Sequence, residues 1–84
     1  MSYALTIKPT AQRQIRQLDL PMVRRIIRKL QQLQQDPRPP GVRKLQGVPG
    51  GYRLRVGKWR ILYTIDDQAK EIHVYQIKHR SKAY

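Results

Sequence analysis

Apolar and polar residues alternate along two neighbouring stretches in the middle of the chain, Tyr52–Val56 and Trp59–Tyr63. This period of two is the pattern of a β-strand that is buried on one side. Gly57 and Lys58 separate the stretches, and a two-residue turn with glycine first is a favoured hairpin connection. Such a turn fixes the register, and the expected pairs are Val56 with Trp59, Arg55 with Arg60, Leu54 with Ile61 and Tyr52 with Tyr63.

This register gives the hairpin one apolar face and one cationic face that carries Arg53, Arg55 and Arg60. Like charges directly opposite each other destabilise a strand pair, so the expected Arg55–Arg60 pair indicates a compensating anion. A phosphate fits, because guanidinium groups bind its oxygens in bidentate fashion. The hairpin therefore predicts a phosphate site.

The amino-terminal part of the chain predicts one strand and two helices. Tyr3, Leu5 and Ile7 alternate with polar or small residues, which indicates a strand. Thr10 is expected to cap a short helix, and Asp19–Pro21 ends it and opens a second. The first helix directs Ala11, Ile15 and Leu18 inward. The second runs from Met22 to about Gln35, with its inward side formed by Val23, Ile26, Ile27, Leu30 and Leu33 and its outward side by Arg24, Arg25, Arg28 and Lys29.

The rest of the chain predicts a connector and a final strand. Prolines make 36–41 an extended connector, 42–45 a brief strand follows it, and 47–51 is a flexible loop. A turn over 66–70, with Asp66 and Asp67 as turn residues, leads into a β-branched and aromatic strand over 72–77. A regular reversal there pairs Ile72 with Ile65, Val74 with Tyr63, Tyr75 with Leu62 and Ile77 with Arg60.

These elements predict an α+β fold and a single domain over residues 1–84. An amino-terminal strand is followed by two helices packed on one face of an antiparallel sheet, and a carboxy-terminal meander leaves an open basic face. A chain of 84 residues has room for one core.

Charge points to a polyanionic partner. Eighteen Lys and Arg against five Asp and Glu give a formal charge of +13. Repulsion among these charges destabilises the folded state unless an anionic partner offsets it. Nucleic acid is the leading partner class; an inert basic surface and a helix on anionic lipid are the alternatives. The chain has no cysteine, which excludes disulfides, thiolate metal sites and cysteine nucleophiles. No signal peptide or membrane span is recognisable, so we expect a soluble, cytoplasmic protein with no membrane partner.

Few residues qualify for acid–base chemistry. The histidines do not form a common metal ligand set, so no metal and no other cofactor is expected. His79 is separated from Tyr75 and Ile77 by even numbers of residues, so on a continuous strand its side chain is expected on their face, toward the arginines, where it could transfer protons. A surface histidine with no such role is an equally good interpretation. Tyr84 fits either a base-stacking residue or a disordered end. The remaining aromatic residues of the hairpin belong to the core face or its rim and are not expected to be nucleotide platforms: Tyr52, Trp59 and Tyr63.

Four segments together resemble the RelE/ParE superfamily of bacterial toxins: Lys44–Gly47, Tyr52–Gly57, Trp59–Tyr63 and His79–Tyr84. The resemblance covers nearly the whole chain and implies the toxin of a type II toxin–antitoxin pair. Its RelE branch implies a metal-independent endoribonuclease, an mRNA interferase, that cuts mRNA in the ribosomal A site and inhibits translation.

The resemblance also implies residue roles. Arg53 and Arg55 match the paired basic residues that hold the scissile phosphate, and Arg60 matches an arginine that stabilises developing charge. Arg80 and Tyr84 match residues that act near the leaving group or stack on a base. The ribosome-dependent prototype has lysines at the positions of Arg53 and Arg55, and guanidinium scarcely deprotonates, so His79 is the alternative general base. Contacts to RNA and the ribosome (16S rRNA) are expected from Lys44, Lys58, Arg24, Arg25, Arg28 and Lys29.

The resemblance leaves two further functions open. The ParE branch poisons DNA gyrase without nuclease activity, but usually lacks the carboxy-terminal His/Arg and Tyr cluster, which favours the nuclease. A non-catalytic nucleic-acid-binding module is the third reading. The implied protein partner is a cognate acidic antitoxin, through which the complex binds promoter DNA.

Overall fold

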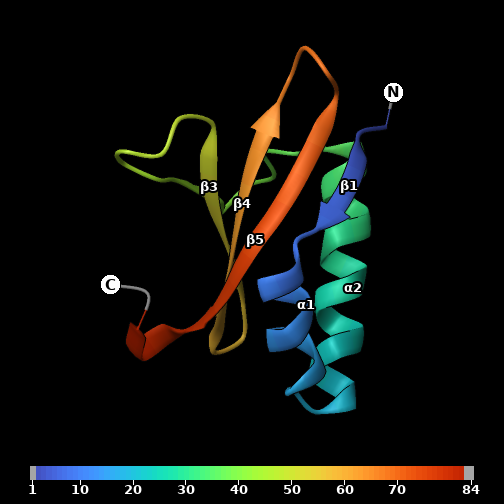
Figure 1. Ribbon diagram of the computed structural model, residues 1–84, viewed down its shortest axis with the longest axis vertical. Coiled ribbons are helices and arrows are strands. Elements are labelled where there is room, and N and C mark those ends of the chain that lie inside the picture. The colour runs from blue at the N-terminus through green and yellow to red at the C-terminus, as the bar shows by residue number, and fades with distance from the viewer. Residues whose placement is uncertain (1, 83–84) are drawn as a thin grey trace.

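The computed structural model describes residues 2–82 and shows a five-stranded sheet with two helices on one side (Figure 1). The elements are, in chain order, β1 (Ala4–Ile7), α1 (Pro9–Arg16), α2 (Leu20–Gln35), β2 (Arg43–Lys44), β3 (Gly51–Val56), β4 (Trp59–Asp66), β5 (Glu71–His79) and the 3₁₀ turn η1 (Arg80–Lys82). The strand order is β1-β5-β4-β3-β2, with β1 parallel to β5 and the other neighbours antiparallel. The predicted α+β fold, with both helices on one face, is confirmed.

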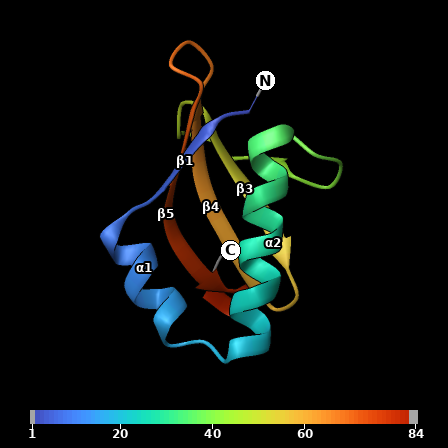
Figure 2. The same cartoon turned by 90° about the vertical axis from the view of Figure 1, so that its right-hand side faces the viewer.

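The core lies between the helices and the inner face of the sheet (Figure 2). Ile26, Leu30 and Leu33 of α2 are at most 3% exposed and pack against sheet residues that include Ile61 and Tyr63. Ile27, expected to point inward, is 38% exposed, so that prediction is wrong. It follows Ile26 by about 100° around the helix, which carries it off the narrow buried stripe.

The two helices begin differently. The prediction that Thr10 caps α1 is wrong: Lys8 is the N-cap residue, no side chain caps the helix, and Pro9 occupies the first turn. Proline is suited to that position because it fixes a helical φ and lacks an N–H that would go unpaired. At α2 the Oδ1 atom of Asp19 accepts a hydrogen bond from the backbone N–H of Met22 at 2.9 Å, so the predicted break also supplies the cap.

The β3–β4 hairpin has the predicted register. Val56 pairs with Trp59, Arg55 with Arg60, and the pairs continue to Tyr52 with Tyr63. Gly57 has a φ of +59°, which the first residue of this kind of turn requires.

The β4–β5 pairing departs from the prediction because β5 contains a bulge. Ile72 pairs with Ile65 and Val74 with Tyr63 as expected, but the register shifts between Leu62 and Tyr63. The expected pairs of Tyr75 with Leu62 and of Ile77 with Arg60 are therefore wrong. The observed pairs beyond the bulge are Leu62 with Gln76, Ile61 with Ile77, Arg60 with Lys78 and Trp59 with His79.

The bulge exchanges the faces on which the last residues of β5 lie. One extra residue reverses the alternation, because successive side chains of a strand point to opposite faces. Ile77 consequently enters the core and is 2% exposed, while Lys78 takes the side of Arg60. Burial of an isoleucine in place of a lysine is the physical reason for the shift.

A polar network, here called the clasp, ties the connector to the β4–β5 turn and consists of Tyr3, Arg38, Tyr52 and Asp67. Arg38 donates through Nη1 and Nη2 to both carboxylate oxygens of Asp67, at 3.2 and 2.8 Å, and through Nε to the hydroxyl of Tyr52. The Tyr3 hydroxyl donates to Asp67 Oδ1 at 2.7 Å. The hydrogen bonds from Arg38 and Tyr3 lower the pKa of Asp67 to about 2.

The clasp gives the two turn aspartates different roles. Asp66 accepts from the backbone N–H of Ala69, as predicted for a turn residue, whereas Asp67 also anchors Arg38. Next to the clasp the buried Tyr63 hydroxyl donates to the carbonyl of Pro37 at 2.7 Å, and burial raises the pKa of Tyr63. The proline-rich connector is thus fixed at two points.

Between residues 2 and 82 no helix has both the length and the apolar character needed to cross a lipid bilayer.

Candidate functional site

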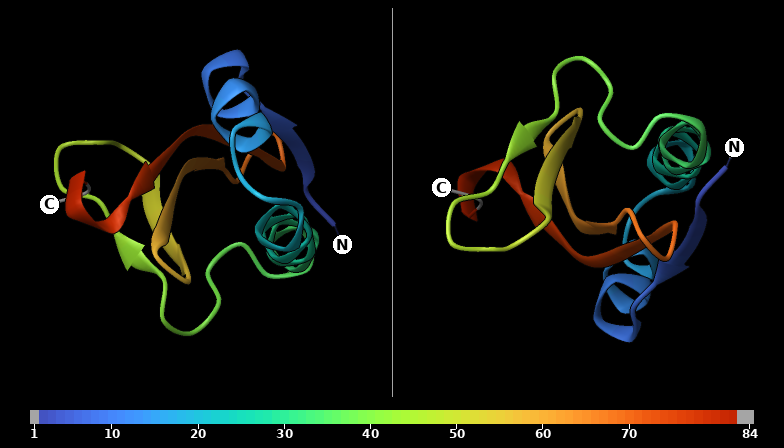
Figure 3. Two further views of the ribbon diagram at one scale, coloured as in Figure 1. Left: turned by 90° about the horizontal axis from the view of Figure 1, so that it is seen from below. Right: turned by 90° about the horizontal axis from the view of Figure 1, so that it is seen from above.

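A basic hollow of about 550 Å³ lies between α2, the connector and β3, and is called the arginine hollow below. Figure 3 shows the connector leaving α2 and passing around the β3 side of the sheet before it reaches β2. The cationic side chains that line the hollow come from α2, β2 and the hairpin, and are Arg25, Lys29, Arg43, Arg53, Arg55 and Arg60. Among the described residues no aspartate or glutamate lines this hollow.

Two like-charged pairs face each other across the strands of this site. Arg55 is directly opposite Arg60, and Arg43 is directly opposite Arg53. Such pairs cost stability unless an anion or solvent separates the charges. The first pair was predicted from the hairpin; the second was missed, since no short turn fixes the β2–β3 register in advance.

The three hairpin arginines differ in exposure. Arg55 is exposed and Arg53 half-buried, whereas Arg60 is only 5% exposed. Nη1 of Arg60 donates to the carbonyl oxygens of Gly57 at 3.2 Å and Trp59 at 3.1 Å. The expectation that all three guanidinium groups face solvent is therefore wrong for Arg60, whose charge is held in place beneath the turn.

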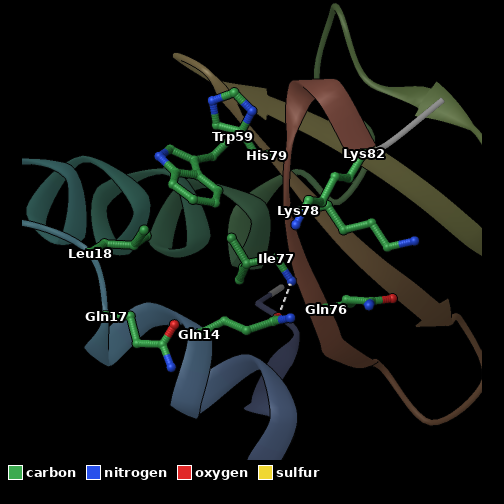
Figure 4. Close-up of a pocket in the computed structure, with 9 residues that line it drawn as sticks. All are labelled: Gln14, Gln17, Leu18, Trp59, Gln76, Ile77, Lys78, His79 and Lys82. Carbon is green, nitrogen blue, oxygen red and sulfur yellow. Dashed lines mark hydrogen bonds between the residues drawn. The ribbon is translucent and has the colours of Figure 1, made fainter.

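The arginine hollow continues around the hairpin turn. A second hollow of about 530 Å³, the tip hollow, shares Arg25, Arg55 and Gly57 with it and is also lined by Lys58 and Arg80. A third hollow of about 490 Å³, the Trp hollow, adjoins the tip hollow (Figure 4). The residues common to these last two are Gln17, Leu18 and Trp59.

His79 lies in the Trp hollow and not among the arginines, so the predicted face is wrong. The bulge pairs it with Trp59, whose ring it meets edge-on at a centroid distance of 5.2 Å. Its Nδ1 lies 3.3 Å from the backbone nitrogen of Ser81, which can only donate, and 3.0 Å from the Ser81 hydroxyl. Nδ1 is therefore an acceptor, and the neutral ring carries its proton on Nε2.

The other predicted contact residues fall in several places. Arg24 and Arg28 are exposed on α2 but line none of the three hollows, whereas Arg25 and Lys29 line the arginine hollow. Lys44, on β2, borders a separate shallow hollow of the loop that follows it. Tyr84 lies outside the described residues. Across residues 2–82 no group of three or more metal-ligating side chains comes together.

Comparison with known proteins identifies relatives. The family model described as ParE toxin of type II toxin–antitoxin system, parDE, matches residues 5–84. No curated protein matches the sequence significantly.

Several solved structures have the same fold. RelE in the archaeal RelE–RelB complex from Pyrococcus horikoshii is 27% identical, with a TM-score of 0.88 over 99% of this chain and 100% of that one. The intact RelBE complex of E. coli gives 22% identity and a TM-score of 0.82 over 93% and 96% of the two chains. The RelBE2 complex of Mycobacterium tuberculosis gives 23% sequence identity and a TM-score of 0.82, over 95% of this chain and 100% of that one.

The family match covers almost the whole chain, and the same residues form the sheet, the helices and the three hollows. The first of these structural matches agrees with it over the full length of both chains. This chain therefore belongs to the ParE toxin family of type II toxin–antitoxin systems, within the RelE/ParE superfamily, and is RelE-like in structure.

Proposed function

We propose that this toxin is a ribosome-dependent endoribonuclease, an mRNA interferase, that cleaves mRNA in the ribosomal A site without a metal ion and so blocks translation in the cytoplasm. Residues 1–84 act in it as one toxin domain. The observation that carries the proposal is the arginine hollow, in which two pairs of opposed arginines lie with no carboxylate among the described lining residues. A phosphodiester is the anion that this arrangement suits best.

The proposed reaction uses the nucleophile of the RNA itself. The 2′-oxygen attacks the adjacent phosphorus and loses its proton, and the bond to the 5′-oxygen breaks as that oxygen gains a proton. The products are a 2′,3′-cyclic phosphate and a 5′-hydroxyl end. This route needs in-line geometry and stabilisation of charge on the phosphate, and it needs no covalent enzyme intermediate.

The arginines divide the work in this proposal. Arg55 is exposed and Arg53 lies beside it, so these two bind the non-bridging phosphate oxygens. The buried guanidinium of Arg60 is fixed by two carbonyls before RNA arrives, which makes it a preorganised charge below the phosphate. Arg80 lines the adjoining tip hollow, and we assign it to the leaving 5′-oxygen.

Among its described lining residues, the arginine hollow has none that is suited to act as a general base. Guanidinium does not accept a proton at neutral pH. His79 lies across the sheet with Nδ1 engaged by Ser81, so the 2′-hydroxyl proton passes to solvent or to a group of the ribosome. We therefore expect slow cleavage of free RNA and fast cleavage where the ribosome orients the message.

The exposed basic residues outside the hollows fit contacts to ribosomal RNA. Arg24 and Arg28 form an exposed cationic side of α2, next to Arg25 and Lys29. Lys44 on β2 and Lys58 at the hairpin turn are exposed as well. Phosphate contacts of this kind position a protein without reading sequence.

A cognate acidic antitoxin is the proposed protein partner. RelE occurs with RelB in the archaeal, E. coli and M. tuberculosis complexes, and the charge of +13 on this chain favours an acidic segment. We expect promoter DNA to be bound only through that antitoxin. Co-expression with candidate antitoxins tests the partner, and equal capture of acidic and neutral candidates would contradict it.

Gyrase inhibition is the second candidate, because the family model that matches is that of the ParE toxin. The two functions separate in two assays with purified components. The nuclease produces new 5′ ends on a message bound to ribosomes and leaves DNA supercoiling by gyrase unchanged. Inhibition of supercoiling without new message ends would reject the nuclease and establish the alternative.

The decisive assay for the proposal maps 5′ ends on an mRNA translated in vitro, with and without the toxin. Codon-positioned cuts on ribosomes are expected. Equal cutting of the same RNA free in solution would contradict the ribosome dependence.

A further inference from the structure

We infer that the Trp hollow holds an unpaired nucleobase of the message, next to the nucleotide whose phosphate occupies the arginine hollow. The inference rests on the proposed function, because it takes single-stranded RNA as the substrate. It assigns Trp59 as a stacking platform, a role that the alternating pattern of the hairpin argued against.

Trp59 is half-buried at the rim of the sheet and not enclosed in the core. Figure 4 shows its indole between Leu18 and His79, with Gln14 and Gln17 across the hollow. The edge-on contact of His79, at 87° between the ring planes, orients the indole. Bases stack on aromatic side chains in proteins that bind single strands, and every base offers a π face for this contact.

The polar groups of the Trp hollow suit the edge of a base. The Oε1 atom of Gln14 accepts from the backbone N–H of Ile77 at 2.6 Å, which fixes this amide and leaves its Nε2 hydrogens as donors. Gln17 adds an exposed amide that can both donate and accept. A base edge carries donors and acceptors that match such amides.

The hollow is also joined to the proposed phosphate site. Trp59 lines both the Trp hollow and the tip hollow, and Arg55 lines both the tip hollow and the arginine hollow. Nη1 of Arg60 donates to the carbonyl of Trp59 at 3.1 Å, while the two side chains, which are successive on β4, point to opposite faces of the sheet, so the tip hollow at the hairpin turn is the connection between them. Lys82 at the far side supplies a cation for the next phosphate.

This charge pattern favours RNA over an apolar protein segment as the occupant. Among the described residues the lining of the Trp hollow contains no carboxylate and includes Lys82, while Lys78 lines it from β5 with its side chain directed away from the indole (Figure 4). An apolar side chain of a protein partner would use the indole but not the amides or Lys82. RNA uses all three, and it enters from the arginine hollow through the tip hollow, whose lining includes Arg25, Lys58 and Arg80 and one carboxylate, the helix cap Asp19.

Trp59 is the one tryptophan of the chain, so its fluorescence reports directly on the hollow. The probe is a trinucleotide with 2′-O-methyl groups, which cannot be cleaved by the proposed route, and the control is the same backbone with abasic residues. The trinucleotide is expected to quench Trp59 at saturation and to bind about 5- to 150-fold more tightly than the abasic strand. Equal binding and equal quenching by the two strands, or no binding of either, would overturn the inference.

A variant makes the test independent of fluorescence. Trp59→Leu keeps an apolar side chain at the rim and is expected to remove the preference for the base-containing strand, measured by anisotropy of a labelled probe. Tyr52→Leu removes a half-buried aromatic ring from the clasp and should leave the preference intact. A preference that survives Trp59→Leu in folded protein would overturn the inference.

Further outcomes separate this inference from the proposed function. Quenching by an acidic peptide and not by the trinucleotide would assign the hollow to a protein partner and overturn it. Cleavage of ribosome-bound message together with no base preference would leave the nuclease standing and reject the platform. A preference for the base-containing strand without cleavage of the message would support the platform and reject the nuclease.

Discussion

The two ends of the sheet use arginine in opposite ways. At the end with the β4–β5 turn, Arg38 donates to both carboxylate oxygens of Asp67 and lies over the ring of Tyr52. At the end with the hairpin turn, Arg55 and Arg60 oppose each other and the described lining of their hollow has no carboxylate. Figure 1 shows the two turns at opposite ends of the sheet.

The distribution of acids explains the difference. Four of the five carboxylate residues lie at the clasp end or next to it, and these are Asp36, Asp66, Asp67 and Glu71. The fifth, Asp19, is engaged as the cap of α2. Arg38 is therefore paired with a carboxylate at one end, whereas at the other end no carboxylate lines the described part of the arginine hollow. The following variants test that division.

The largest effect is expected from Arg60→Ala. Loss of one preorganised charge from a site of this type costs about 10²- to 10³-fold in rate, so cleavage and toxicity should fall while most RNA affinity remains. Cleavage on programmed ribosomes and filter binding measure the two properties, and a thermal melt checks the hairpin. Equal losses of rate and affinity would make the site a binding module only.

At the clasp end Tyr63→Phe is expected to affect folding alone. The variant leaves the buried Pro37 carbonyl without its donor, which costs about 1–3 kcal/mol in the free energy of unfolding. Urea denaturation measures this loss. An unchanged denaturation midpoint would show that the Tyr63 hydroxyl does not secure the connector. A slower cleavage rate per folded molecule would show that the clasp end of the sheet also affects activity at the hairpin end.

Salt dependence gives a smaller effect that differs between the ends. Arg55→Ala should reduce the slope of log affinity against log salt for single-stranded RNA by about 0.7, because one phosphate contact disappears. Arg38→Ala should leave the slope unchanged, since Asp67 already pairs that cation. A reduced slope for Arg38→Ala would show that the clasp also meets RNA.

The smallest effect concerns acid pH. The pKa of Asp67 is about 2 in the fold against an ordinary value of 3.8, so its ionised form stabilises the fold above pH 3.8 and this contribution is lost as the pH falls toward 2. Asp67→Asn should therefore lower the melting temperature near neutral pH, with the difference closing between pH 3.8 and 2. A difference that stays constant across this range would contradict the assignment.

Local signals were sufficient for the hairpin. The two-residue turn at Gly57 and Lys58 determines the register of its strands, so the Arg55–Arg60 pair followed from the sequence. The bulge in β5 did not follow, because it depends on how Ile77 packs against the core, which is a tertiary property. His79 was misplaced for that reason alone.

Long-range polar contacts were also beyond the sequence. Arg38 and Asp67 are 29 residues apart, and no sequence pattern around either residue predicts that they pair. Arg43 was missed in the same way, since its position opposite Arg53 depends on the path of the connector. The sequence thus predicted the arginines of the hairpin but not the contribution of Arg43 and the connector to the arginine hollow.

The account is tested most directly by the single-turnover rate of mRNA cleavage on ribosomes for Arg55→Ala and Arg38→Ala, compared at equal amounts of folded protein. We predict a rate below that of the unaltered toxin for Arg55→Ala, by less than the loss of about 10²- to 10³-fold expected for Arg60→Ala, and an unaltered rate for Arg38→Ala. Equal rates for the two variants would contradict the claim that the arginine hollow, and not the general basicity of the chain, carries the activity.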